Sequence, residues 1–125
     1  MFYNVLFVAL GGALGSVARF LISKATQSVC TLSFPIATLI VNVLGCFIIG
    51  LLYAIFERNA TIDSNIRLML TVGFCGGFTT FSTFINENFN LIGNDNFVVS
   101  AIYIGLSVVL GFIGVWLGAW VIRAL

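Results

Sequence analysis

The sequence predicts an all-α membrane protein, with four transmembrane helices forming one domain over residues 1–125. The chain is 61% hydrophobic and 7% charged, whereas soluble domains average about 45–50% and about 25%. In addition, four stretches are nearly free of charge, and each is long enough to cross a bilayer, which takes about 20 residues of helix. We expect the spans near residues 2–23, 34–56, 68–92 and 97–123.

The connectors between the predicted spans are too short to form domains of their own. The first, near residues 24–33, ends before Pro35, which suits the first turn of a helix because proline has no N–H to leave unpaired. The second connector is the most charged, with Glu57, Arg58, Asp63 and Arg67. The net charge of +1 indicates no nucleic-acid partner. We therefore expect the function to reside within the lipid bilayer.

Glycines four residues apart occur in three of the predicted spans. The pairs are Gly11 and Gly15, Gly73 and Gly77, and Gly114 and Gly118. This spacing puts small residues on one helix face, which lets two backbones approach closely where hydrophobicity gives no net drive to associate. We interpret these pairs as helix-packing faces rather than ligand sites.

The basic residues are nearly balanced between the two sides of the membrane. With four spans, Arg58, Arg67 and Arg123 lie on one side, and Lys24 and Arg19 lie at the other. Because an excess of Lys and Arg sets the orientation, so weak a bias predicts insertion both ways up. If the two orientations pair, the product is an antiparallel, dual-topology homodimer.

The third predicted span contains the segment 73–84, GFCGGFTTFSTF, in which glycines precede hydroxyl residues interleaved with aromatics. Paired glycines and successive threonines are poor helix formers, so we expect this helix to be broken in the middle. In lipid, a broken helix is tolerated where its freed backbone groups are buried in protein or bind ions. The alternative is a kink packed with small residues.

Aromatic rings within this segment suit an anion. Phe78, Phe81 and Phe84 recur every three residues, so we expect them to share one helix face. The edge of a phenylalanine ring is positive, so it can meet an anion without presenting a full charge that would trap it. The hydroxyl residues around these rings, which a lipid-facing surface avoids, are Thr79, Thr80, Ser82 and Thr83.

The second and fourth spans add polar residues at helical spacing. Thr38 and Asn42 lie one turn apart, and the Asn42 amide could join helices or donate to an anion. Tyr103, Ser107 and Gly111 are spaced by four and form a thin polar stripe. Acidic residues are missing from the interior of every span, with Glu87 just past the apolar core of the third, and this argues against a proton-coupled carrier.

Four motifs together resemble the Fluc, or CrcB, family of fluoride channels. They are the segment 11–20 (GGALGSVARF), the segment 38–45 (TLIVNVLG), the segment 73–84 and Glu87 just beyond it. The resemblance covers the whole chain and is most specific in the third span. It is weakest in the fourth span, where Gly111 stands at a position expected to carry a hydroxyl.

The resemblance implies a dual-topology antiparallel homodimer in the inner (cell) membrane, which exports fluoride passively to relieve its toxicity and is not an enzyme. It implies that Phe81 and Phe84 form an aromatic box, and that the Asn42 amide coordinates fluoride. Backbone carbonyls of Gly76 and Thr79 would hold a structural sodium ion at the dimer centre. Other implied pathway residues are Thr38, Thr80, Ser82, Thr83, Tyr103 and Ser107, with Arg19 near the pore vestibule and Glu87 near a pore end.

Two other functions fit the size of the chain. A four-span dual-topology multidrug exporter would need a membrane-embedded acidic residue, which the first span lacks. A non-transporting membrane assembly subunit would explain the glycines. It would not explain why aromatic and hydroxyl residues gather on one broken span.

Overall fold

The computed structural model describes residues 1–29 and 34–125. These residues form helices and connecting turns, and four helical spans are long and apolar enough to cross a bilayer. The spans are Phe2–Val29, Ile36–Arg58, Ser64–Gly93 and Phe97–Ala124. The prediction of an all-α protein with four membrane spans is therefore confirmed.

Three spans are single helices and the third is interrupted. The elements in chain order are α1 (Phe2–Val29), α2 (Ile36–Arg58), α3 (Ser64–Leu68), the π-helical segment η1 (Met69–Cys75), α4 (Gly76–Phe78), α5 (Ser82–Gly93) and α6 (Phe97–Ala124). Between α4 and α5 the chain leaves the helix, because Thr79 is extended with φ −88° and ψ 160°. The predicted break in the third span is confirmed, and it comprises residues 79–81, at the start of the run of hydroxyl residues that follows the paired glycines.

The helices extend beyond the apolar segments from which the spans were predicted. Helix α1 continues past residue 23 to Val29, and its polar end bonds to its own backbone, as when the Thr26 hydroxyl donates to the Ile22 carbonyl at 2.8 Å. The third span begins at Ser64, because the Asp63 carboxylate accepts the Asn65 N–H at 3.3 Å. Hydropathy locates the hydrocarbon-crossing part of a helix and misses these polar ends. Residues 30–33 of the first predicted connector lie outside the described residues.

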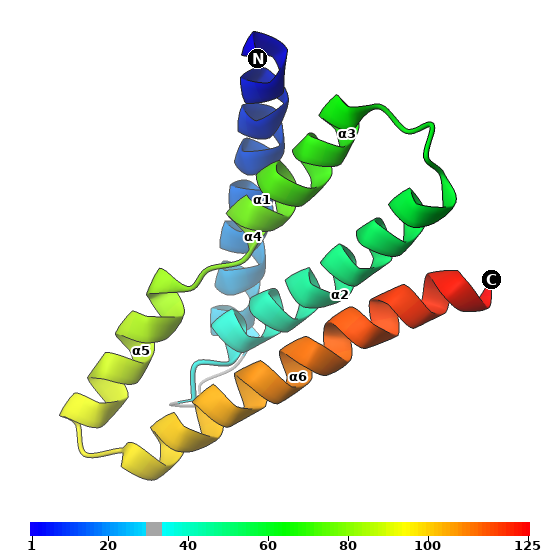
Figure 1. Cartoon of the computed structure of the whole chain (residues 1–125). Coiled ribbons are helices and arrows are strands. Elements are labelled where there is room, and N and C mark those ends of the chain that lie inside the picture. The colour runs from blue at the N-terminus through cyan, green and yellow to red at the C-terminus, as the bar shows by residue number, and fades with distance from the viewer. Residues whose placement is uncertain (30–33) are drawn as a thin grey trace.

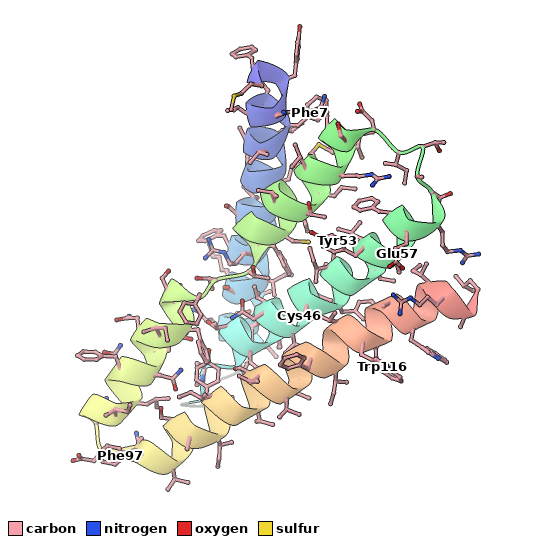
Figure 2. The ribbon with its side chains drawn as sticks, viewed as in Figure 1. Phe7, Cys46, Tyr53, Glu57, Phe97 and Trp116 are labelled. Atoms are coloured by element: carbon pink, nitrogen blue, oxygen red, sulfur yellow. The ribbon has the colours of Figure 1, made fainter. Side chains whose placement is uncertain are left out.

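The helices pack as two pairs (Figure 1). Helix α1 crosses the first part of the third span and contacts η1 and α4, whereas α2 and α6 run side by side. Beyond the break, α5 turns away from α1 and packs chiefly against α6. In Figure 2, Phe97 lies at the turn between α5 and α6, at the opposite end of α6 from the C-terminus. The break in the third span therefore lies between the two helix pairs.

The glycine pairs lie where backbones meet, as the sequence predicts. A Cβ atom on Gly15 of α1 would collide with the Phe74 carbonyl, and one on Gly73 would lie 2.8 Å from the Val8 carbonyl oxygen. In the other helix pair, a Cβ on Gly118 would collide with the Phe47 carbonyl of α2. Both contacts between helices therefore depend on the absence of a side chain.

Arginines organise the second connector and the neighbouring helix ends. The Arg67 guanidinium donates to the carbonyls of Ala60 at 3.1 Å and Ile62 at 3.2 Å, and it lies 5.3 Å from the centre of the Phe56 ring. Arg58 donates to the Ile122 carbonyl near the end of α6. Figure 2 places Glu57 at the same end of the α2–α6 pair. Arg58 therefore joins the ends of α2 and α6, and Arg67 holds the connector against the end of α2.

Candidate functional site

The break in the third span is bonded to Asn42 of α2. The Asn42 Oδ1 accepts the Thr80 N–H at 2.8 Å, and its Nδ2 donates to the Thr80 carbonyl at 2.9 Å. A continuous helix would pair that N–H with the Gly76 carbonyl, so one side chain replaces the backbone pairing that the break removes. The amide nitrogen also carries a second N–H, which these two bonds do not use.

The same face of α2 meets the third span one turn before and one turn after Asn42. The Thr38 hydroxyl donates to Glu87 Oε2 of α5 at 2.9 Å. A Cβ on Gly45 would collide with the Thr79 methyl group, so Gly45 leaves the room that the extended residue at the break occupies. One stripe of α2 thus contacts the third span on both sides of its break.

Arg19 of α1 also reaches the break. Its Nε donates to the Gly77 carbonyl at 3.0 Å, and the side chain is partly buried. In an unbroken helix that carbonyl would accept the N–H of Phe81, which the break has moved away. A cation therefore lies beside the break and supplies the donor that the helix has lost.

Two carbonyls at the break lose their helical donors. The Thr80 N–H that would reach the Gly76 carbonyl goes to Asn42 instead. The Thr83 N–H that would reach the Thr79 carbonyl donates to the Thr80 hydroxyl at 3.3 Å. Gly76 is also exposed on the described chain. These are the two carbonyls from which the resemblance builds a cation site, and such freed carbonyls suit a cation.

Glu87 joins three helices at one carboxylate. One oxygen accepts the Thr38 hydroxyl of α2, and the other accepts the Tyr103 hydroxyl of α6 at 2.7 Å. Tyr103 is fully buried and Thr38 nearly so, while Glu87 is half-buried. The structure therefore brings together three of the residues predicted from separate spans.

Phe81 and Phe84 lie next to each other, but in different surroundings. Their ring centres are 6.1 Å apart with planes at 41°. Phe84 is 9% exposed and meets the Tyr103 ring edge to face at 5.0 Å, whereas Phe81 is 73% exposed. The Phe81 ring is thus free, on the described chain, to contact an ion, lipid or a second protein.

The prediction that Phe78 shares a face with these two rings is wrong. Phe78 is 2% exposed and stacks on Phe74 at 5.6 Å, before the break. The three-residue spacing holds only for a continuous helix, and the chain is extended between Phe78 and Phe81. Phe78 is a core residue.

The polar stripe on α6 includes Ser107, whose buried hydroxyl makes no hydrogen bond to the described residues. Ser107 and Gly111 line an open groove of about 320 Å³ together with Cys46, which Figure 2 shows midway along α2. Ser82, in contrast, is exposed at the start of α5. Ser107 is therefore the residue beside this groove whose hydroxyl is buried and has no partner among the described residues.

Two polar residues that the sequence analysis missed are buried beside this site. Asn88 of α5 is 5% exposed and Ser100 of α6 is 2% exposed, and the Ser100 hydroxyl donates to Asn88 Oδ1 at 2.8 Å. Asn88 follows Phe84 by four residues and Ser100 precedes Tyr103 by three. Both residues lie inside the predicted spans, and this spacing puts each one turn from an aromatic ring, but no pattern within one helix shows that the two bond to each other.

The arrangement suits binding of small ions without covalent chemistry. Hydroxyl, amide and ring-edge donors gather on one side of the break, and freed carbonyls lie at the break itself. Over residues 1–29 and 34–125, no group of three His, Cys, Asp or Glu residues converges, so the oxygen ligands that the break offers are backbone carbonyls.

Comparison with known proteins gives consistent matches over the length of the chain. Residues 6–119 match the family model described as CrcB-like protein, Camphor Resistance (CrcB). A relative from Phocaeicola vulgatus is 47% identical over 94% of this chain and 96% of its own length, and a relative from Flavobacterium psychrophilum is 37% identical over 98% of both. A third, from Leptospira interrogans, is 42% identical over 96% of this chain and 94% of its own. Each of these relatives is named a fluoride-specific ion channel, FluC.

Proposed function

We propose that this chain, which belongs to the CrcB-like protein family, is a fluoride-selective channel that lets fluoride leave the cell passively and so relieves fluoride toxicity. Relatives that match nearly its full length are named fluoride-specific ion channels. The structural observation that carries the proposal is the broken third span, where Phe81 and Phe84 follow a break held by Asn42. A channel makes and breaks no covalent bond, so the protein is not an enzyme.

Selection in this channel rests on donors that replace the water around fluoride. The positive ring edges of Phe81 and Phe84, the unused N–H of Asn42 and the free Ser107 hydroxyl offer such donors without a fixed charge. Conduction also requires weak binding at each position, so that the ion can leave. Ring edges meet this requirement better than an arginine or lysine in the pathway would.

The protein is a multi-pass membrane protein, and we place it in the inner (cell) membrane as an antiparallel homodimer. The near-balance of Lys and Arg supports insertion in both orientations. The 73% exposure of Phe81 supports a second subunit, because a pathway needs a wall on that side of the ring. A reporter fused to the C-terminus should therefore appear on both sides of the membrane. Reporters found on one side alone would exclude the antiparallel dimer.

The carbonyls of Gly76 and Thr79 would hold a structural sodium ion at the dimer centre. They fit this role because the break has redirected their helical donors to Asn42 and the Thr80 hydroxyl. The ion would neutralise converging carbonyl dipoles and would not be transported. Fluoride flux should then be the same with and without a sodium gradient. A flux that follows an imposed sodium gradient in fixed proportion would instead indicate a coupled carrier.

The direct test is fluoride efflux from liposomes that contain the purified protein, followed with a fluoride-selective electrode. We expect rapid efflux once the charge is balanced by a potassium ionophore, and no comparable efflux of chloride. Protein-free liposomes give the leak rate. Efflux at the leak rate would reject the channel. Proton-driven uptake of cationic drugs would instead support the multidrug exporter, which the names of the relatives do not favour.

A further inference from the structure

Helix α5 carries two of the residues on which the proposed pathway depends, yet few elements hold it in place. Phe84 and Glu87 both lie on α5, which begins after the extended break and packs chiefly against α6. A helix that is free of its preceding turn and held by few contacts can rotate about its axis. Such a rotation would move the Phe84 ring and the Glu87 carboxylate together.

A buried pair of polar side chains links α5 to α6. Asn88 Nδ2 donates to the Phe84 carbonyl at 2.9 Å, and Asn88 Oδ1 accepts the Ser100 hydroxyl at 2.8 Å. Both side chains are buried, at 5% and 2% exposure. A buried amide in a membrane protein is unfavourable without partners, and here both of its ends have one. The pair therefore specifies a single arrangement of the two helices.

The position of this pair matters as much as its chemistry. Asn88 lies one turn beyond Phe84, and Ser100 lies one turn before Tyr103 on α6. Tyr103 itself bonds to Glu87 and meets the Phe84 ring. Attachment at Glu87 alone, to Tyr103 of α6 and Thr38 of α2, would leave α5 free to pivot about that residue. A second attachment, one turn away, fixes its rotation.

We propose that Asn88 and Ser100 are positioning residues, which set the rotation of α5 against α6 and thereby place Phe84 and Glu87 in the ion pathway. The inference rests on the proposed function, because the rotation of α5 affects conduction only if Phe84 and Glu87 line the ion pathway. Neither residue needs to touch the ion. Losing their bond would change how each channel conducts, without reducing how many channels assemble.

The sharpest comparison is between Ser100→Thr and Ser100→Val, which have the same shape and differ by one hydroxyl. We measure the fluoride current through single channels in planar bilayers. In Ser100→Thr we expect a current within about twofold of the parent's, and in Ser100→Val a current about tenfold lower than the parent's. Asn88→Leu should behave like Ser100→Val, whereas Asn86→Leu, at an exposed position of the same helix, should not. Asn88→Leu also decides the question if an added methyl at Ser100 prevents folding.

The readout separates positioning from stability. If the pair only stabilised the fold, Ser100→Val would give fewer channels of parental current and parental fluoride-over-chloride selectivity, and that result would overturn the proposal. An independent measurement is the ¹⁹F chemical shift of 3-fluorotyrosine placed at Tyr103. We expect this chemical shift to change in Ser100→Val and Asn88→Leu and to keep its parental value in Ser100→Thr. If the parent conducts no fluoride, the proposed function fails, and an unshifted resonance would show separately that the pair does not position α5.

Discussion

The two halves of the third span are held in different ways. Before the break, η1 and α4 lie against α1 chiefly at glycines, where backbone meets backbone, and one side-chain hydrogen bond joins Arg19 to the Gly77 carbonyl. After the break, α5 is tied to α2 and α6 by hydrogen bonds at Glu87 and Asn88. The first half is fixed mainly by shape and the second mainly by directional bonds.

This difference follows from what a bilayer offers as a solvent. Apolar helices gain little by associating in lipid, so they associate through close van der Waals contact or through hydrogen bonds. Close backbone contact fixes where a helix lies, and hydrogen bonds fix how individual side chains are aimed. The half with directional bonds is also the half that carries Phe81, Phe84 and Glu87. Mutations in the first half should therefore reduce chiefly folding stability, and mutations at the directional bonds should reduce chiefly fluoride flux.

The largest effect is expected from Gly15→Ala in the half fixed by shape. The new Cβ would collide with the Phe74 carbonyl, and neither backbone can turn aside as a flexible side chain could. We expect a loss of about 3 kcal/mol of folding free energy, at the upper end for overpacking. Thermal unfolding in detergent, followed by circular dichroism, measures this loss.

The matched control for this change is Gly105→Ala on α6, where a Cβ would have nothing within 4 Å. The control should unfold at the parental temperature. If Gly15→Ala unfolded there too, the contact between α1 and the first half of the third span would be looser than the glycines indicate. The comparison between the two halves would then be wrong.

The next largest effect is expected from Asn42→Asp, which removes a directional bond and keeps the side-chain shape. The carboxylate can still accept the Thr80 N–H, but it cannot donate to the Thr80 carbonyl and would repel it. We expect fluoride flux to fall about a hundredfold, the upper range for leaving a buried polar group unpaired. The proposed dimer should remain intact on a sizing column. Asn86→Asp, at an exposed position of α5, is the control. Parental flux in Asn42→Asp would mean that the break is held by other contacts.

Phe81→Ile should reduce fluoride flux by about tenfold, since it removes a positive ring edge worth on the order of 1 kcal/mol and keeps a bulky apolar side chain. Phe89→Ile on α5, the helix that begins directly after Phe81, is a matched control, because both phenylalanines are 73% exposed. Folding of both variants should be parental. Equal flux through the two variants would mean that Phe81 is an ordinary surface residue and that the pathway lies elsewhere.

Much of the fold could be predicted from the sequence because lipid imposes simple rules. Four apolar stretches predict four spans, paired glycines predict close helix contacts, and the Gly-Gly and Thr-Thr pairs of the third span predict its break. The resemblance to the CrcB family is confirmed by the family match over residues 6–119. Each of these predictions depends on local composition or on the identity of a motif.

The features that could not be predicted depend on how one helix is rotated against another. Spacing put Phe78 on a face with Phe81, but the break separates them. Asn42 was expected to join helices or bind an anion, and nothing in its neighbours identifies both backbone atoms of Thr80 as its partners. The pair of Asn88 and Ser100 joins residues on two helices, so no single-helix pattern reveals it. The ion contacts of Phe81, Phe84 and Asn42 stay predictions.

The smallest effect is expected from Leu110→Ile on α6. This exchange tests whether apolar contacts outside the two halves of the third span matter for conduction. Leu110 lines an apolar groove of about 520 Å³ between α2 and α6, together with Leu39 and Phe47. The exchange conserves volume and removes no hydrogen bond, so we expect less than about 1.5 kcal/mol of destabilisation and fluoride flux within about twofold of the parent. The same assays that follow Gly15→Ala and Asn42→Asp measure both quantities. A large loss of flux with parental stability would mean that this groove belongs to the pathway, and conduction would then depend on apolar packing as well as on the directional bonds beyond the break.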